Sequence, residues 1–188
     1  MRPIILYIAT TLDGYIAGPE GQIDWLFDDQ DYGYDDFYQD VDLILMGRKT
    51  WDFVASLDEF PYAGVDCLVF THNPPATAHP GVTFTSQSPA EVMPALKKND
   101  GGVIWLCGGG ELATSFLAAG LVDEMRLFVH PFLLGDGVRL FGKMAEPAVF
   151  LPESVTPYES GLIELTYHLA TSEGDEDDFD DEGEEEDD

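Results

Sequence analysis

Short runs of consecutive apolar residues recur along the chain and predict the strands of a buried sheet. The first run, Ile4–Ala9, has almost no polar alternation, which is typical of a strand buried on both faces. Glycine and aspartate then punctuate Thr10–Asp24, which we expect to be a loop. Further strands are expected at Val41–Met46, Val65–Phe70, Val82–Thr85, Val103–Cys107, Glu124–Pro131 and Leu162–Ala170.

Helical patterns separate most of these strands. They are expected at Tyr32–Gln39, Lys49–Ser56, Pro89–Lys98 and Glu111–Ala119. No helical pattern separates the last strands, so these should pair antiparallel. The order of elements predicts a three-layer α/β domain with a mixed, mostly parallel central sheet and antiparallel C-terminal strands.

Charge divides the chain into a body and a tail. Ser172–Asp188 carries 13 acidic residues, no basic residue and one apolar residue, Phe179. Such a segment cannot bury a core and is expected to be disordered. We therefore predict one domain over residues 1–171 and an acidic tail over residues 172–188.

The body is also acidic, which bears on its partners and its solvent. The whole chain has 37 acidic and 8 basic residues, a net charge of −29, and residues 1–171 alone have 24 and 8. This balance argues against binding to nucleic acid phosphates or to anionic membranes. It is typical of proteins that work in molar salt, where the Debye length is about 3 Å. We interpret the source as halophilic and haloarchaeal; the alternative is an ordinary acidic protein whose tail recruits basic partners.

Cysteines and the N-terminus add little chemistry. Cys67 and Cys107 lie in apolar runs and are expected to be free thiols in the core. The histidines are scattered without metal-ligand spacing, so no metal site is expected. The apolar N-terminal run is too short for a signal peptide or a membrane span, which favours a soluble, cytoplasmic protein.

The sharpest motif is a glycine run between a buried strand and a helix. Gly108, Gly109 and Gly110 precede Glu111 and Leu112 at the expected start of the helix. Glycine lets the backbone approach a ligand closely, and a helix N-terminus offers free N–H groups to phosphate. The run matches the G-x-G-x-x-A dinucleotide pattern, although not after the first strand as in Rossmann domains. A tight strand–helix turn is the alternative.

A second strand–helix junction carries two of the few cations. Arg48 and Lys49 follow Gly47 and precede Thr50. Cations are disfavoured at a helix N-terminus, so their presence here indicates an anionic ligand. Thr71, at the end of another strand, is expected to line the same groove. Two such junctions fit a dinucleotide with an extra 2′-phosphate, which favours NADPH over NADH.

The loop after the first strand is the expected substrate side. Asp13 is a candidate for orienting a substrate or transferring a proton, and its alternative role is that of a turn aspartate before Gly14. Trp25 lies nearby in the sequence and is a candidate for stacking on a planar ring.

These motifs occur together in one known superfamily. The ordered set TTLDGYIA, GQIDWL, GYDDFYQDVDLILMGRKTWD and GGGELATSFLAAGLVDEMRLFVHPFLLGDGVRLF resembles the dihydrofolate-reductase-like superfamily. It is most similar to the reductase domain of riboflavin biosynthesis, the C-terminal half of bifunctional deaminase-reductases, and to its stand-alone relatives. The resemblance spans Ile4–Ala170.

The resemblance implies hydride transfer from NADPH to a pyrimidine- or pteridine-like small molecule, in a homodimer. By position, Ala9 and Thr10 would lie near the nicotinamide, and Asp13 would lie on the substrate side. Thr71 would lie by the adenosine ribose. The adenosine-side phosphates would be bound by Gly47, Arg48, Lys49 and Thr50, and the pyrophosphate by Gly108, Gly109, Gly110, Glu111 and Leu112.

The substrate stays open at this point. Dihydrofolate reductases carry a carboxylate on the first helix, and Asp31, Asp35 and Asp36 are unmatched candidates for it. The riboflavin-pathway enzyme must bind a ribose phosphate, for which Arg126 and Arg139 are the remaining cations. The alternatives to a riboflavin-pathway reductase are therefore a dihydrofolate reductase and a non-catalytic nucleotide-binding dimer of the same fold.

Overall fold

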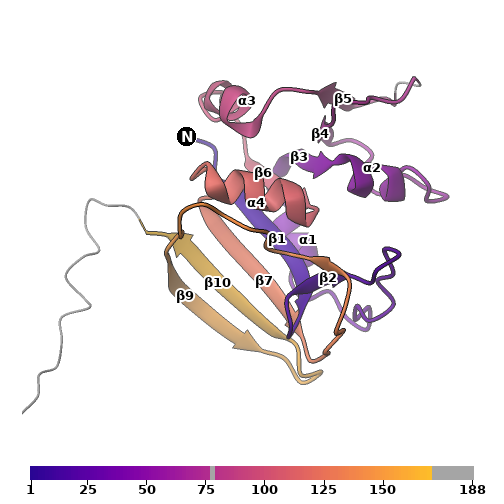
Figure 1. The fold of residues 1–188 in the computed structure, drawn as a ribbon, viewed down its shortest axis with the longest axis vertical. Helices are drawn as coiled ribbons and strands as arrows, with labels where there is room; N and C mark the ends of the chain where they lie inside the picture. Colours follow the sequence, from indigo (N-terminus) through magenta and orange to yellow (C-terminus); the bar gives the residue numbers. More distant parts are fainter. Residues whose placement is uncertain (77–78, 171–188) are drawn as a thin grey trace, which may run out of the picture.

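The structure, a computed structural model, describes residues 1–76 and 79–170 and is built around an eight-stranded sheet (Figure 1). The order of strands across it is β5-β4-β3-β6-β1-β7-β10-β9. Their bounds are β1 Ile4–Thr11, β3 Val41–Gly47, β4 Asp66–Phe70, β5 Val82–Thr85, β6 Val103–Gly108, β7 Glu124–His130, β9 Phe150–Pro157 and β10 Ile163–Leu169.

The sheet is mixed, as predicted. All pairings from β5 across to β7 are parallel. Only β10 reverses direction, and it pairs antiparallel with both β7 and β9. The mostly parallel sheet with antiparallel C-terminal strands is therefore confirmed.

Within residues 1–76 and 79–170, four helices cover the two faces of the sheet. They are α1 Tyr34–Gln39, α2 Arg48–Val54, α3 Pro89–Leu96 and α4 Gly110–Ala118. Met93 of α3 and Phe116 of α4 belong to one apolar cluster, whereas Phe37 of α1 and Trp51 of α2 belong to another. Figure 1 shows α4 crossing the front of the sheet, with α1 behind it. The helix–sheet–helix layers follow from these two clusters.

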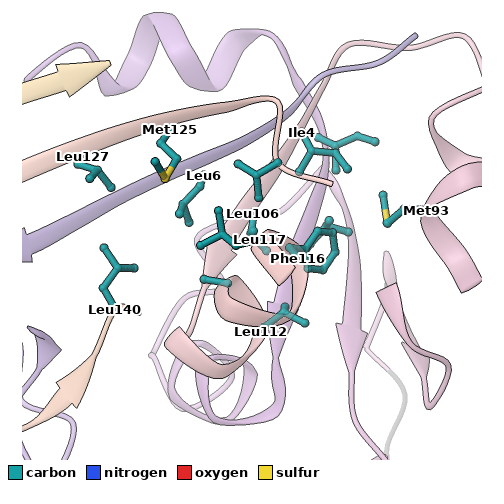
Figure 2. Packing of buried hydrophobic residues seen from close by; sticks show 14 of the residues in the cluster. Ile4, Leu6, Met93, Leu106, Leu112, Phe116, Leu117, Met125, Leu127 and Leu140 are labelled. Atoms are coloured by element: carbon teal, nitrogen blue, oxygen red, sulfur yellow. The ribbon is translucent and has the colours of Figure 1, made fainter. Parts of the chain in front are cut away.

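The first cluster is aliphatic and is centred on α4. Phe116 is fully buried and, as Figure 2 shows, lies with Leu112 and Leu117 beneath the strands that carry Leu6 and Leu106. Along β1, Ile4 and Leu6 belong to this cluster while Ile5 belongs to the other. Because both faces of β1 are buried, its sequence shows no polar alternation.

The second cluster is aromatic. Trp105 of β6 meets Phe37 edge-on at 5.7 Å and Tyr62 at 5.4 Å. Tyr7 of β1 stacks on Phe37 at 4.1 Å between ring centroids. These contacts fix α1 against the centre of the sheet.

Three strands differ from the sequence prediction. The expected loop Thr10–Asp24 contains β2 (Tyr15–Ala17), which pairs with β8 (Val138–Arg139) in a separate ribbon. The pairing joins segments far apart in the chain, so no local pattern marks it. The third, β9, includes Pro152 and Pro157 and lies at the edge of the sheet, where proline is tolerated.

The predicted tail and the last residue of the predicted domain cannot be compared with the structure. The acidic tail, residues 172–188, lies outside the described residues, as does Thr171. Across residues 1–76 and 79–170, none of the helices has the length and apolar character needed to cross a membrane.

Candidate functional site

The two glycine-containing strand–helix junctions lie side by side at the carboxyl edge of the sheet. Strands β3 and β6 are neighbours, with Met46 opposite Gly108. A Cβ placed on Gly47 would lie 3.9 Å from the Gly108 carbonyl oxygen and 3.8 Å from Cβ of Leu112. From here β3 leads through α2 to β4 on one side, and β6 leads through α4 to β7 on the other. Ligands of open α/β sheets bind at such a point.

Two glycines of this region are required by the fold. Gly108 has φ +124°, a conformation that residues with a side chain rarely adopt. A Cβ on Gly110 would lie 2.0 Å from the Arg139 carbonyl oxygen, so the approach of β8 to α4 excludes any larger residue. Both positions are explained without a ligand.

The other two glycines are not required by the fold. Gly47 and Gly109 have φ −81° and −80°. A Cβ on Gly109 would lie 3.6 Å from Thr50 Oγ1, and one on Gly47 no closer than 3.8 Å to any atom. Both distances are ordinary van der Waals contacts. Neither a positive φ nor a lack of space therefore calls for glycine at these two positions, and the missing side chains leave room for the close approach of a ligand between the junctions.

The start of α4, at the junction formed by Gly108, Gly109 and Gly110, is free to bind an anion. In the described residues no side chain caps α2 or α4, whereas Glu91 of α3 accepts the Ser88 N–H at 2.8 Å. The first N–H groups of α4 therefore lack protein partners and carry the positive end of the helix dipole.

The predicted cations lie at the start of α2, beside the groove. Lys49 Nζ is 3.8 Å from Glu111 Oε1, and both side chains are almost fully exposed. Arg48 Nε donates to Asp52 Oδ1 at 2.7 Å, and Arg48 Nη1 donates to the Asn73 carbonyl. Thr71, which follows β4, in turn accepts the Asn73 N–H with its Oγ1 at 3.1 Å. Because Arg48 follows β3, these hydrogen bonds connect the carboxyl ends of β3 and β4. The structure thus brings Arg48, Lys49 and Thr71 to one side of the glycines.

The end of β1 forms the opposite side. Thr10 is buried, and its hydroxyl donates to the Tyr15 carbonyl at 3.2 Å, whereas Ala9 is half-buried. Ile16 of β2 was not predicted as a site residue, yet its Cδ1 would contact a Cβ on Gly109 at 3.8 Å. The sequence signal for it is only an apolar residue after the Asp13-Gly14 turn.

Asp13 ties two loops together. Its carboxylate accepts the Thr11 hydroxyl at 2.6 Å and the N–H groups of Leu134 and Gly135 at 3.1 and 2.7 Å. These hydrogen bonds, above all that from Thr11, lower the pKa of the Asp13 carboxyl to about 2. The group is therefore ionised at neutral pH, which suits the predicted orienting role and disfavours the predicted role in donating a proton.

Trp25 is buried rather than open for stacking. Its side chain is 7% exposed, and its ring meets that of His130 edge-on at 5.1 Å. Its Nε1–H is buried without a partner in the described part of the chain. An unpaired buried donor costs about 1–3 kcal/mol, which a ligand or a water molecule would offset. The group that Trp25 offers is therefore its indole N–H, not a free ring face.

The sequence is similar to proteins related to riboflavin biosynthesis. Residues 66–163 match the family described as the RibD C-terminal domain. The uncharacterized Bacillus subtilis protein YwjB is 40% identical over 147 residues, covering 76% of this chain and 84% of that protein. YyaP, also uncharacterized and from B. subtilis, is 35% identical over 178 residues, covering 89% and 95%.

Solved structures share the fold. A Shewanella sp. PV-4 protein named for riboflavin biosynthesis superposes with TM-score 0.80 at 29% identity, covering 90% of this chain and 99% of that one. The Thermotoga maritima diaminohydroxyphosphoribosylaminopyrimidine deaminase/5-amino-6-(5-phosphoribosylamino)uracil reductase superposes with a TM-score of 0.70 at 17% sequence identity, covering 90% of this chain and 57% of that one. Enterococcus faecalis dihydrofolate reductase, complexed with NADP(H), superposes with a TM-score of 0.62 at 19% sequence identity, covering 90% of this chain and 97% of that one. The expected dihydrofolate-reductase-like fold is thereby confirmed.

Proposed function

The chain belongs to the RibD C-terminal domain family, and from this premise we propose that it is an NADPH-dependent reductase of a pyrimidine- or pteridine-like substrate. The family and the neighbouring structures support a riboflavin-pathway reductase-like fold. The observation that carries the proposal is the neighbouring pair Gly47 and Gly109, at which neither φ nor the space for a Cβ calls for glycine.

The residues present fit a dinucleotide. The uncapped start of α4, from Gly109 to Leu112, would hold the pyrophosphate by backbone N–H groups, and Gly47 and Gly109 would let it approach. Thr50 lies between the two junctions and offers a hydroxyl. Thr71 would lie by the adenosine ribose. When bound, NADPH supplies the hydride, and the protein supplies position and electrostatics.

The selectivity for NADPH is assigned to the cations of α2. Arg48 and Lys49 are the first two residues of the helix, and both side chains reach solvent. A 2′-phosphate carries charge that NADH lacks, and a guanidinium can bind it with two parallel hydrogen bonds. In the free protein, Arg48 is held toward β4 by Asp52 and by the Asn73 carbonyl, which preorganises it.

On the substrate side, the residues lie at the end of β1. Ala9 is small and half-buried, which allows a flat ring to lie close to the backbone. Asp13 fixes the loop that carries Gly135 against this strand end. A riboflavin-type ribosylaminopyrimidine phosphate is the first candidate substrate, and dihydrofolate is the second because of the shared fold with dihydrofolate reductase.

NADPH binding and oxidation test the proposal directly. Saturating NADPH should raise the melting temperature of the full chain, since a ligand at 100 times its Kd stabilises by about 2.7 kcal/mol. NADPH oxidation, followed by absorbance, should require 5-amino-6-(5-phosphoribosylamino)uracil or dihydrofolate. Binding without oxidation of either would favour the non-catalytic nucleotide-binding protein, and absence of binding would refute the proposal.

Arg48→Ala tests the cofactor selectivity. The variant should weaken NADPH at least tenfold and change the affinity for NADH less than twofold, because only NADPH carries the 2′-phosphate. Lys98→Ala, which removes one cation beyond the end of α3, is the control for net charge. Equal losses for the two cofactors would contradict the assignment.

A further inference from the structure

His130 joins three parts of the chain that are far apart in sequence. It is the last residue of β7, it lies opposite Thr11 of β1, and it is 3% exposed. Its Nδ1 is 3.0 Å from the Phe128 carbonyl oxygen, and its Nε2 is 3.2 Å from the backbone nitrogen of Phe27. A carbonyl only accepts and an N–H only donates, so both contacts are satisfied by the neutral imidazole with its proton on Nδ1.

The segment that His130 contacts has few other anchors. In the described part of the chain, the hydrogen bonds of residues 19–31 join them to one another or to residues within four positions along the chain, except the one from Phe27 to His130. The rings of Trp25 and Phe27 pack on the imidazole at 5.1 and 4.9 Å between centroids. His130 therefore supplies both a polar and an aromatic attachment of this segment, and Phe27 also packs on Phe132, two residues beyond β7, at 6.1 Å between ring centroids.

We propose that His130 is a positioning residue, whose neutral imidazole holds the Trp25–Phe27 segment as a wall of the substrate side of the groove. This rests on the proposed function, because the substrate side is defined by the end of β1, and Thr11 there is paired with His130. The segment carries the buried, unpartnered indole N–H of Trp25. Holding the segment keeps that donor in place for an acceptor on the substrate, such as a ring carbonyl.

Protonation would break this arrangement. An imidazolium carries a proton on both nitrogens, so its Nε2–H would face the Phe27 N–H in place of the acceptor that this N–H needs. The backbone groups of Phe128 and Thr10 that face the ring act in the opposite direction, toward its charged form. Asp24 and Asp28 flank the segment, Asp13 follows β1, and Glu164 lies on β10 opposite Phe128. In the described residues none of these carboxylates is bonded to the imidazole. Burial lowers the pKa of His130, which keeps it neutral at neutral pH.

Two variants and a matched control test the role. His130→Ala removes the acceptor, whereas His130→Gln keeps an amide that accepts at one atom and donates at the other. His168→Gln changes an exposed histidine of β10. Amide hydrogen exchange of Phe27 should accelerate at least tenfold in His130→Ala, return toward the wild-type rate in His130→Gln, and stay unchanged in His168→Gln.

Kinetics then separate positioning from general stability. With 5-amino-6-(5-phosphoribosylamino)uracil as the probe, His130→Ala should raise KM at least tenfold and change the Kd of NADPH less than twofold. The wild-type KM should rise as the pH falls through the lowered pKa of His130, and His130→Gln should lack that rise. If His130→Ala does not fold, the same comparison of Phe27 exchange is made on the wild-type chain and His130→Gln at pH 5 and 7.5.

Each outcome decides the proposal. Unchanged Phe27 exchange in His130→Ala, or an equal loss of Phe27 protection relative to the intrinsic exchange rate in wild type and His130→Gln at pH 5, would overturn it. Loss of substrate and NADPH binding in equal measure would indicate a general structural role and would also overturn it. If the wild-type chain neither binds nor oxidises NADPH, the proposed function fails, and the exchange experiment still reports whether His130 holds the segment.

Discussion

Gly47→Ala should separate cofactor binding from folding. The backbone at Gly47 is extended, with φ −81° and ψ 168°, which alanine adopts without strain. The added Cβ would lie 3.8 Å from Leu112 Cβ and 3.9 Å from both the Gly108 oxygen and the Gly109 nitrogen. The free chain has room for it, so the variant should be as stable as wild type or more stable by about 0.4–1 kcal/mol.

The same methyl group should obstruct a ligand. It lies between the two junctions, and carbon contacts are optimal at about 3.5–4.0 Å. A phosphate oxygen that must come within about 2.7–3.2 Å of a backbone N–H is then displaced. We expect NADPH to bind at least tenfold more weakly, which is about 1.4 kcal/mol. At a concentration of 100 times the wild-type Kd, the stabilisation by NADPH should fall from about 2.7 to about 1.4 kcal/mol.

Thermal unfolding with and without NADPH measures both quantities at once. Gly110→Ala is the counterpart, because its Cβ would lie 2.0 Å from the Arg139 carbonyl oxygen. Such overpacking costs about 1–3 kcal/mol, so this variant should melt lower even without ligand. If Gly47→Ala keeps the full NADPH-dependent shift, no ligand approaches Gly47 and Gly109 and the reasoning from them is wrong.

Three further predictions concern stability. Asp13→Asn should weaken the loss of stability at low pH, measured as the free energy of unfolding by circular dichroism. The Asp13 pKa lies at about 2 in the folded chain instead of 3.8, so its contribution to stability is present above pH 4 and is lost as the pH falls through 2. An unchanged loss would contradict this. Asp123→Ala leaves the Ile4 N–H and the Lys97 ammonium without their carboxylate and should cost about 1–3 kcal/mol in urea unfolding, with Asp100→Ala as a surface control. The melting temperature should rise between 0.1 and 1 M KCl, as the Debye length falls from about 10 to 3 Å around a chain of net charge −29; a fall would refute the halophilic interpretation.

The sequence predicts the central sheet well because burial leaves a continuous apolar signal. β1, β3 and β6 have helices on both faces, so their central residues are apolar without alternation. β2 and β8 are three and two residues long, and only their mutual pairing makes them strands. Nothing local encodes such a pairing.

The candidate site is predictable in composition but not in detail. The glycine runs and the Arg48-Lys49 pair are visible in the sequence, and the parallel order of β3 and β6 brings them together. Which glycines serve the fold and which are free depends on neighbours such as Arg139, far along the chain. The anchoring by His130 likewise depends on a contact with Phe27, 103 residues away.

The position of β1 has a consequence for how the chain folds during synthesis. Its two neighbours in the sheet are β6 and β7. Ile4 can pair only after Ile104 has been synthesised, and the β7 partner of Ile5 is Glu124. At about 5–20 residues per second, the ribosome needs roughly 6–25 s to make that partner. Until then, this apolar strand lacks its β7 partner and can aggregate. We therefore expect folding to be largely post-translational, and ribosome-associated chaperones to retain nascent chains that end before β7.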